Sequence, residues 1–219
     1  MISSVKEWNE TIKKLKGIIL KESYADEVSE MMVSLHQFVH TASVFSASSD
    51  TYEDELWRRC DTGIATRFTR AKMYSIAWHL WHSARVEDIA VSHFLCTDRE
   101  VHVDTDFRSR LGIPFHHTGN SMEHEDMEVF NANIDIEQLR SYRNAVGTKT
   151  REALTRLTTV DLKRKVDSKS LETIRGTGSV AEEDTWLLDF WGKKNVAGIV
   201  TMPLTRHVLV HLNSSFRLL

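Results

Sequence analysis

The sequence predicts a single all-α domain with four principal helices and several accessory ones. Three observations predict this class. The chain of 219 residues contains only two prolines and nine glycines, which is sparse punctuation for a fold made of many short strands. Apolar residues recur at helical spacing through most of the chain. No internal repeat or low-complexity segment divides residues 1–219, and one domain is the usual outcome at this length.

The first two expected helices are amphipathic. Residues 3–20 are rich in lysine and carry an apolar stripe at helical spacing. Residues 26–44 repeat this pattern, and acidic residues crowd their start, where they favour the helix dipole. Residues 45–52 are expected to form a loop, in which Thr51 is a candidate cap for the short helix TYEDELWRRC.

The most apolar helix is expected over residues 69–97. Apolar side chains occupy most of its circumference, so we expect it at the centre of the fold. Residues 98–134 are expected to be irregular, with short helical pieces near 104–110 and 123–131. An irregular connection of this length is often functional or covers a site.

Three further helices are expected in the C-terminal part of the chain. Residues 135–159 form a long amphipathic helix, and residues 179–193 form a helix that bears tryptophans. Residues 195–217 form the last helix, with Asn195 as a candidate cap and Pro203 as a candidate kink.

Charge and composition exclude several functional classes. The net charge is −3, from 28 basic and 31 acidic residues. Since no positive excess is present to release counterions from phosphates, we expect no nucleic-acid partner. The chain also lacks a glycine-rich phosphate loop, an HExxH motif and a Ser/His/Asp context, which argues against NTP use, dinucleotide binding and standard zincin hydrolysis.

The expected location is the cytoplasm. No apolar stretch reaches the roughly 20 residues that a helix needs to span a bilayer, so no membrane association is expected. The N-terminus carries charged residues throughout and lacks the apolar core of a signal peptide. Cys60 and Cys96 give no disulfide framework and are expected to be reduced thiols.

Histidines are the main functional signal, because the chain has 11 of them. His207 and His211 are four residues apart, a spacing that places both rings on one face of a helix, close enough to chelate one ion. Val200 and Leu204 share that face, so the pair is expected to point inward. Buried imidazoles without partners are costly, and a bound cation removes that cost. The alternative is a pair of ordinary core or surface histidines.

His82 strengthens the metal hypothesis. It lies midway along the most apolar helix, on a face with Trp78 and Val86. One ligand from this helix and two from an antiparallel neighbour make a facial site of three nitrogens, which leaves a coordination position open. The expected cofactor is a divalent ion, zinc or nickel first, with iron or copper as alternatives, because three neutral imidazoles suit all four.

Other residues have less defined roles. His36 and His40 form a second HxxxH pair; they are either packed together or act at the metal as auxiliary ligands or as the catalytic general base. His79 is a fourth ligand, a donor that orients a ligand, or a surface ring. Glu87 and Asp88 are expected to be structural acids, the alternative being a carboxylate that orients a ligand imidazole. The remaining histidines lie in or near the irregular region and are expected mostly at the surface: His93, His102, His116, His117 and His124.

Two segments together resemble a known superfamily. SIAWHLWHSARVEDI and MPLTRHVLVHLNSSFRL are similar to segments of the DinB/YfiT-like superfamily, and more closely of a bacterial DinB-like branch with WHLWHxARxED and RHxxxHLN. TYEDELW and SYRNAVGTKTRE also resemble that branch, so the resemblance covers most of the chain. It implies a four-helix bundle with a long crossover connection. It also implies a divalent metal held by three histidines, which correspond to His82, His207 and His211.

The resemblance further implies partners and activities. The superfamily includes metal-dependent transferases and isomerases that use low-molecular-weight thiols, and many members with no known activity. Related proteins are often dimers, so a homodimer and a small-molecule substrate or thiol partner are expected. One departure is that relatives often carry an acidic residue shortly after the final histidine, where this chain has Ser214 and Ser215.

Three functions are compatible with the sequence. The first is a metal-dependent transferase or hydrolase, in which the ion lowers the pKa of a bound thiol or water. The second is a non-catalytic metal-binding or stress-related protein, whose ion stabilises the helical bundle. The third is a helical interaction scaffold without a metal.

Overall fold

The computed structural model describes residues 2–68 and 73–219. Within these ranges the chain is all-helical, as the sequence predicts. An isolated antiparallel bridge between Lys165 and Asn195 is the one β pairing among the described residues. No helix in these ranges is long and apolar enough to cross a membrane.

The helices fall into an N-terminal group, a central group and a C-terminal group. The N-terminal group comprises α1 (Val5–Ile18), α2 (Ala25–Phe38), α3 (Ala42–Phe45), α4 (Tyr52–Arg59) and α5 (Thr62–Ala65). The central group comprises α6 (Ile76–Ala90), a π-helical segment (Val91–Cys96), α7 (Val101–Asp104), α8 (Phe107–Arg110), α9 (His124–Asn133) and α10 (Ile136–Leu154). The C-terminal group comprises α11 (Thr159–Lys163), α12 (Ser168–Thr177), α13 (Trp186–Gly192), α14 (Val196–Thr201) and α15 (Arg206–Phe216), and short 3₁₀ turns lie at Glu22–Tyr24 and Glu182–Asp184.

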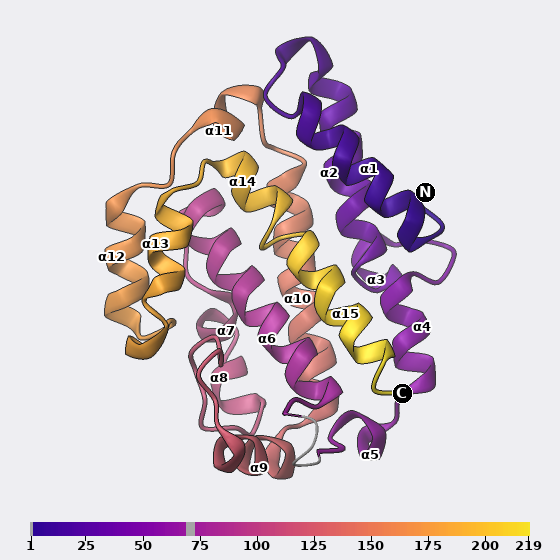
Figure 1. The fold of residues 1–219 in the computed structure, drawn as a ribbon, viewed down its shortest axis with the longest axis vertical. Helices are drawn as coiled ribbons and strands as arrows, with labels where there is room; N and C mark the ends of the chain where they lie inside the picture. The colour runs from indigo at the N-terminus through magenta and orange to yellow at the C-terminus, as the bar shows by residue number, and fades with distance from the viewer. Residues whose placement is uncertain (1, 69–72) are drawn as a thin grey trace.

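Helix α6 packs against both α15 and α10 (Figure 1). Helix α15 runs antiparallel to α6, whereas α10 runs in the same direction as α6. Residues 97–135 therefore return along the molecule between two parallel helices, and they carry α7, α8 and α9. Helix α2 packs on α10, and α1 covers α2 from outside. The pair α12 and α13 lies at the opposite edge from α1.

Helix α6 is central because its sequence can be buried on all sides. Ser75 caps its start by accepting a hydrogen bond from the backbone N–H of Trp78. Every residue of α6 except His79 is buried. The buried set includes polar side chains, and such groups need hydrogen-bond partners inside the protein. Several of these partners come from other helices, and the sites of the protein form where the polar groups of α6 meet them.

Two expected helices begin or end elsewhere than predicted. The helix expected over 26–44 ends at Phe38. The backbone N–H groups of Val39 and His40 bond to carbonyls three residues earlier in the chain, and the next helix is α3. Thr41 is extended at this break, and its hydroxyl donates to the side chain of Asn144 in α10. Of the helix expected over 69–97, residues 69–72 lie outside the described residues, and the helix begins at Ile76.

The C-terminal segment differs in a similar way. The helix expected over 195–217 is two helices, since the chain leaves the helical conformation around Pro203, between α14 and α15. Asn195 caps α14 as predicted, by accepting from the N–H of Gly198. The helix expected over 179–193 is shorter, and α12 was not predicted. Thr51 caps α4 as predicted, in a reciprocal capping box with Asp54.

Candidate metal centre

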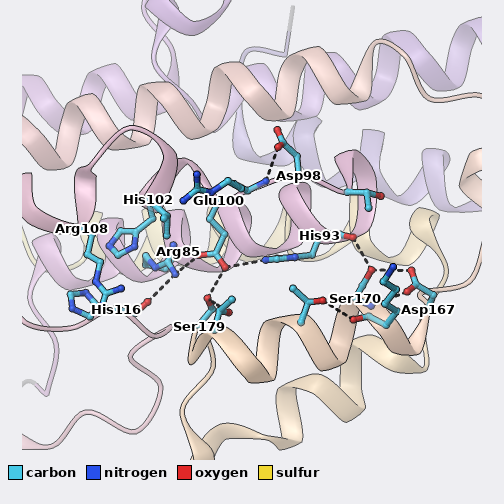
Figure 2. Close-up of a pocket in the computed structure, with 16 residues that line it drawn as sticks. Arg85, His93, Asp98, Glu100, His102, Arg108, His116, Asp167, Ser170 and Ser179 are labelled. Carbon is cyan, nitrogen blue, oxygen red and sulfur yellow. Dashed lines mark hydrogen bonds and ion pairs between the residues drawn. The ribbon is translucent and has the colours of Figure 1, made fainter.

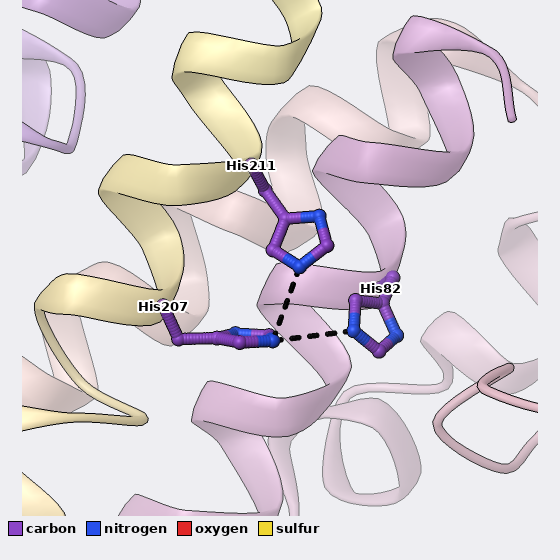
Figure 3. A group of neighbouring side chains, drawn as sticks. All are labelled: His82, His207 and His211. Carbon is purple, nitrogen blue, oxygen red and sulfur yellow. Dashed lines mark hydrogen bonds between the residues drawn. The ribbon is translucent and has the colours of Figure 1, made fainter.

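Three histidines meet where α15 packs against α6 (Figure 3). His82 comes from the middle of α6, and His207 and His211 come from successive turns of α15. The Nε2 atom of His207 lies 3.2 Å from Nε2 of His82 and 3.1 Å from Nε2 of His211. The same nitrogen of each ring therefore points to one place, as the ligands of a single ion do.

The other ring nitrogens explain why the rings point this way. His82 donates from Nδ1 to the carbonyl oxygen of Thr118 at 2.6 Å, which fixes its tautomer and leaves a lone pair on Nε2. The Nδ1 atoms of His211 and His79 lie 2.9 Å apart, so one of them donates to the other. Among the described residues, buried Nδ1 of His207 has no hydrogen-bond partner.

The donor set fits a divalent metal. Without a cation, His207 has at most one hydrogen on Nε2 and can donate to only one of the two neighbouring nitrogens. At least one of the three Nε2 atoms is then left without a hydrogen-bond partner among these rings. A cation accepts all three lone pairs at once, and three imidazole nitrogens suit zinc, nickel, copper or ferrous iron.

Burial keeps these imidazoles in the neutral form that binds metals. Burial lowers the pKa of His82 to about 4 and that of His207 to about 3. The pKa of His211 is lowered as well, first by burial and then by its proximity to His207 and His82. At neutral pH each of the three rings is therefore neutral and keeps one nitrogen free of a proton.

The surroundings of the three rings are aromatic and apolar. The ring of Trp78 stacks on His82, with centroids 4.5 Å apart and an interplanar angle of 4°. His207 also forms part of the wall of a pocket of ≈ 260 Å³. The other lining residues are mostly apolar and come from α6, the connection between α8 and α9, α13 and the residues after α14: Val86, Asn120, Trp186, Leu187, Phe190, Trp191, Met202 and Pro203.

His36 and His40 do not join this group; they form a second one with Glu87. His36 donates from Nε2 to one carboxylate oxygen of Glu87 at 2.7 Å, and His40 donates from Nε2 to the other at 2.9 Å. All three side chains are buried, and this group could also hold a metal ion. Burial lowers the pKa of His36 to about 4. Burial alone would raise the pKa of Glu87, but the neighbouring His40 and His36 hold it well below its usual range.

The acids of α6 have structural partners, as expected from the sequence. Glu87 binds the two histidines, and Asp88 accepts hydrogen bonds from the hydroxyl of Tyr142 and the backbone N–H groups of Val101 and His102. Among the described residues, neither acid accepts a hydrogen bond from a ring of the three-histidine group.

Two contacts of the site were not predicted. The carbonyl of Thr118 orients His82, but a backbone acceptor has no side-chain signature in a sequence. The grouping of Glu87 with His36 joins residues 51 positions apart, so no local spacing indicates it. His79, for which three roles were predicted, pairs with His211 through Nδ1.

In a comparison with known proteins, no protein-family model matches the chain and no curated protein matches it at a significant level. Fold and site define the class of protein: over the described residues it is all-helical, with one partly buried and one fully buried side-chain group that could each hold a metal ion.

Proposed function

We propose that the chain is a DinB-like divalent-metal-binding protein, with its ion held by Nε2 of His82, His207 and His211. The observation that carries this proposal is the convergence of three Nε2 atoms whose rings are oriented through Nδ1 at two of the three positions. The antiparallel pairing of α6 with α15 and the long return between the parallel helices α6 and α10 support the bundle type that the resemblance implies.

The activity we propose for this site is transfer or hydrolysis. A bound zinc or nickel ion would lower the pKa of a thiol or water and so supply a nucleophile at neutral pH. The chain's own residues would position the reactants. Trp78 covers one ring of the ligand set, and the pocket beside His207 can take the apolar part of a small-molecule substrate while excluding water. A low-molecular-weight thiol is the proposed co-substrate.

His36 and His40 are proposed to hold a proton near the reaction. Their hydrogen bonds to Glu87 let an imidazole and a carboxylate share one proton. The charge of Glu87 acts on His207 and opposes the lowering of its pKa by burial. This electrostatic effect links the two groups. The role of His36 and His40 as general base is a prediction.

A non-catalytic metal protein is the alternative, and burial favours it. His82 is only 3% exposed, so an ion there would mainly hold α6 and α15 together. A ligand that binds only the native state stabilises it by mass action. A homodimer and a cytoplasmic location remain predictions under either function.

Elemental analysis of the untagged protein tests the metal. We expect stoichiometric divalent metal in the wild type and its loss in His82→Ala, His207→Ala and His211→Ala, because two imidazoles bind far more weakly than three. His124→Ala in α9 is the matched control and should retain the metal, as should His36→Ala if the second group holds none. Far-UV circular dichroism checks that each variant remains helical. Retention of metal by all three ligand variants would overturn the proposal.

Cobalt substitution separates the two functions. If the ion has an open position, a small thiol should add a sulfur-to-cobalt charge-transfer band to the spectrum of the cobalt-loaded protein. A spectrum that does not respond to thiols, together with a large fall in melting temperature on chelation, would favour the non-catalytic alternative.

A further inference from the structure

A second, larger pocket lies between the π-helical end of the central helix, α7, α8 and α12 (Figure 2). Its volume is ≈ 690 Å³. Arg85, Glu100 and His102 form its buried part, and α12 contributes hydroxyl groups along the opposite wall. Neither the three proposed metal ligands nor the His36 group lines this pocket in the described part of the chain.

The acids at the pocket are already matched by partners. Glu100 accepts from Arg85 at 2.8 Å, from the hydroxyl of Ser179 at 2.6 Å and from Nε2 of His93 at 3.1 Å. Asp167 caps α12 by accepting from the backbone N–H of Ser170. These carboxylates are therefore structural, and the pocket does not need a cation to balance them.

Several hydrogen-bond donors at one end of the pocket have no acceptor among the described residues. Arg108, His102 and His116 lie together there, to the left of Arg85 in Figure 2. The ring centroids of His102 and His116 are 5.8 Å apart. Arg108 has no ion-pair or hydrogen-bond partner for its guanidinium within residues 2–68 and 73–219.

Buried polar atoms without partners are the second observation. In the described part of the chain, Nε2 of His102, Nδ1 of His116 and Nε of Arg85 are buried and make no hydrogen bond. His102 is only 2% exposed. Each such atom costs stability, so three of them around one pocket indicate a place for a ligand that accepts hydrogen bonds.

Hydrogen bonds hold the backbone at two of these donor residues. The carboxylate of Asp88 holds the backbone N–H of His102 at 2.8 Å, and the carbonyl of His116 accepts from Arg85 at 2.9 Å. The backbones of His102 and His116 are therefore held in place without a ligand, so that binding at these two residues needs little reorganisation.

We propose that this pocket binds a small organic anion, with its phosphate or carboxylate group at Arg108, His102 and His116. Neutral imidazoles donate N–H groups to the oxygens, and Arg108 adds a charge-assisted hydrogen bond. The rest of the ligand lies against the hydroxyls of Ser170 and Thr173 on α12, which suits a polar body. This proposal does not depend on the metal.

The two sites are connected by one short segment. The carbonyl of His116 accepts a hydrogen bond from Arg85, which lines the pocket. Two residues later, the carbonyl of Thr118 orients His82. An anion bound at the pocket therefore lies beside the segment that positions a proposed metal ligand. The binding test is performed on chelator-treated protein, so failure of the metal proposal would not affect its outcome.

Calorimetry at constant ionic strength tests the pocket, with inorganic phosphate and citrate as probes. We expect the wild type to bind at least one probe and Arg108→Gln to bind it at least about tenfold more weakly, since a charge-assisted hydrogen bond is lost. Arg110→Gln is the matched control. It removes the same charge from the same helix, but the guanidinium of Arg110 binds Gln138 and does not line the pocket.

A second variant separates a binding role from a structural one. His102→Phe keeps a buried ring and removes the unpartnered Nε2 atom. We expect weaker anion binding together with equal or higher thermal stability, whereas a purely structural His102 would lose stability. Binding of phosphate alone or citrate alone would support the proposal and identify the oxyanion. Absence of binding by both probes, or equal weakening in Arg108→Gln and Arg110→Gln, would overturn it.

Discussion

Gly147 shows how closely the buried histidines are packed. It lies within α10, opposite the ring of His40. A Cβ atom at this position would lie 2.7 Å from Nδ1 of His40 and 3.1 Å from two further ring atoms. The ring cannot easily withdraw, because its Nε2 is held by Glu87 at 2.9 Å. Only glycine leaves room for this arrangement.

We therefore expect Gly147→Ala to lower the free energy of unfolding by about 1–3 kcal/mol, as overpacking does. Gly17→Ala is the matched control, since Gly17 also lies in a helix and a Cβ atom there would meet nothing within 4 Å. It should stabilise the protein by up to about 1 kcal/mol through helix propensity. Urea denaturation measures both. A stabilising Gly147→Ala would contradict a fixed His40 ring.

Individual residues of the candidate site were partly predictable. Spacing and apolar neighbours made His82, His207 and His211 candidates, the resemblance joined them into one predicted site, and the structure brings them together. The expectation of a surface position was wrong for His102, because Asp88 holds its backbone N–H and draws α7 into the core. That contact crosses 14 residues and leaves no periodic pattern in the sequence.

One buried ion pair joins three helices. Arg143 of α10 binds both carboxylate oxygens of Glu53 in α4, at 2.6 and 3.0 Å. Its third nitrogen donates to the carbonyl of Leu80 and the hydroxyl of Ser83 in α6. Both charged side chains are fully buried. Removing one partner would leave a desolvated charge at the junction of these helices.

Arg143→Met should therefore lower the free energy of unfolding by about 3–5 kcal/mol. The exposed pair of Arg59 and Glu55 provides the comparison, since its atoms are 3.6 Å apart and both side chains are about half exposed. Arg59→Met should change stability by less than about 0.5 kcal/mol. Chemical denaturation of both variants measures the difference. Similar effects would show that Glu53 is protonated or hydrated when Arg143 is removed.

Helices with long apolar stripes were predictable, and those set by tertiary contacts were not. α1 and α10 agree with the periodicity of their sequences, and α6 agrees with the apolar composition of its segment. The break after α2 depends on Thr41 and its hydrogen bond to α10, a contact across 103 residues. Helix α12 was not predicted because only Ser170 and Ile174 of its ten residues are buried, which gives no apolar stripe.

Across the whole molecule, α6 distributes buried polar groups in three directions. His82 faces α15, Glu87 faces His36 of α2, and Asp88 faces α7 and α10. Each direction leads to a separate polar group rather than one continuous network. Since such groups cost stability unless they are paired, this helix depends on the complete fold, which explains why its neighbours come from all parts of the chain.

Proton binding by the buried histidines should govern how stability depends on pH. Burial lowers the pKa of several of them, to about 4 for His36, His79 and His82 and to about 3 for His207. In the unfolded chain histidines titrate near 6.5, so between about pH 6.5 and 4 the unfolded state binds more protons. The free energy of unfolding of metal-free protein should then fall as pH falls through this window, by up to about 1.4 kcal/mol per pH unit for each histidine. Urea denaturation with chelator at successive pH values measures this slope, and a flat profile between about pH 6.5 and 4.5 would contradict it.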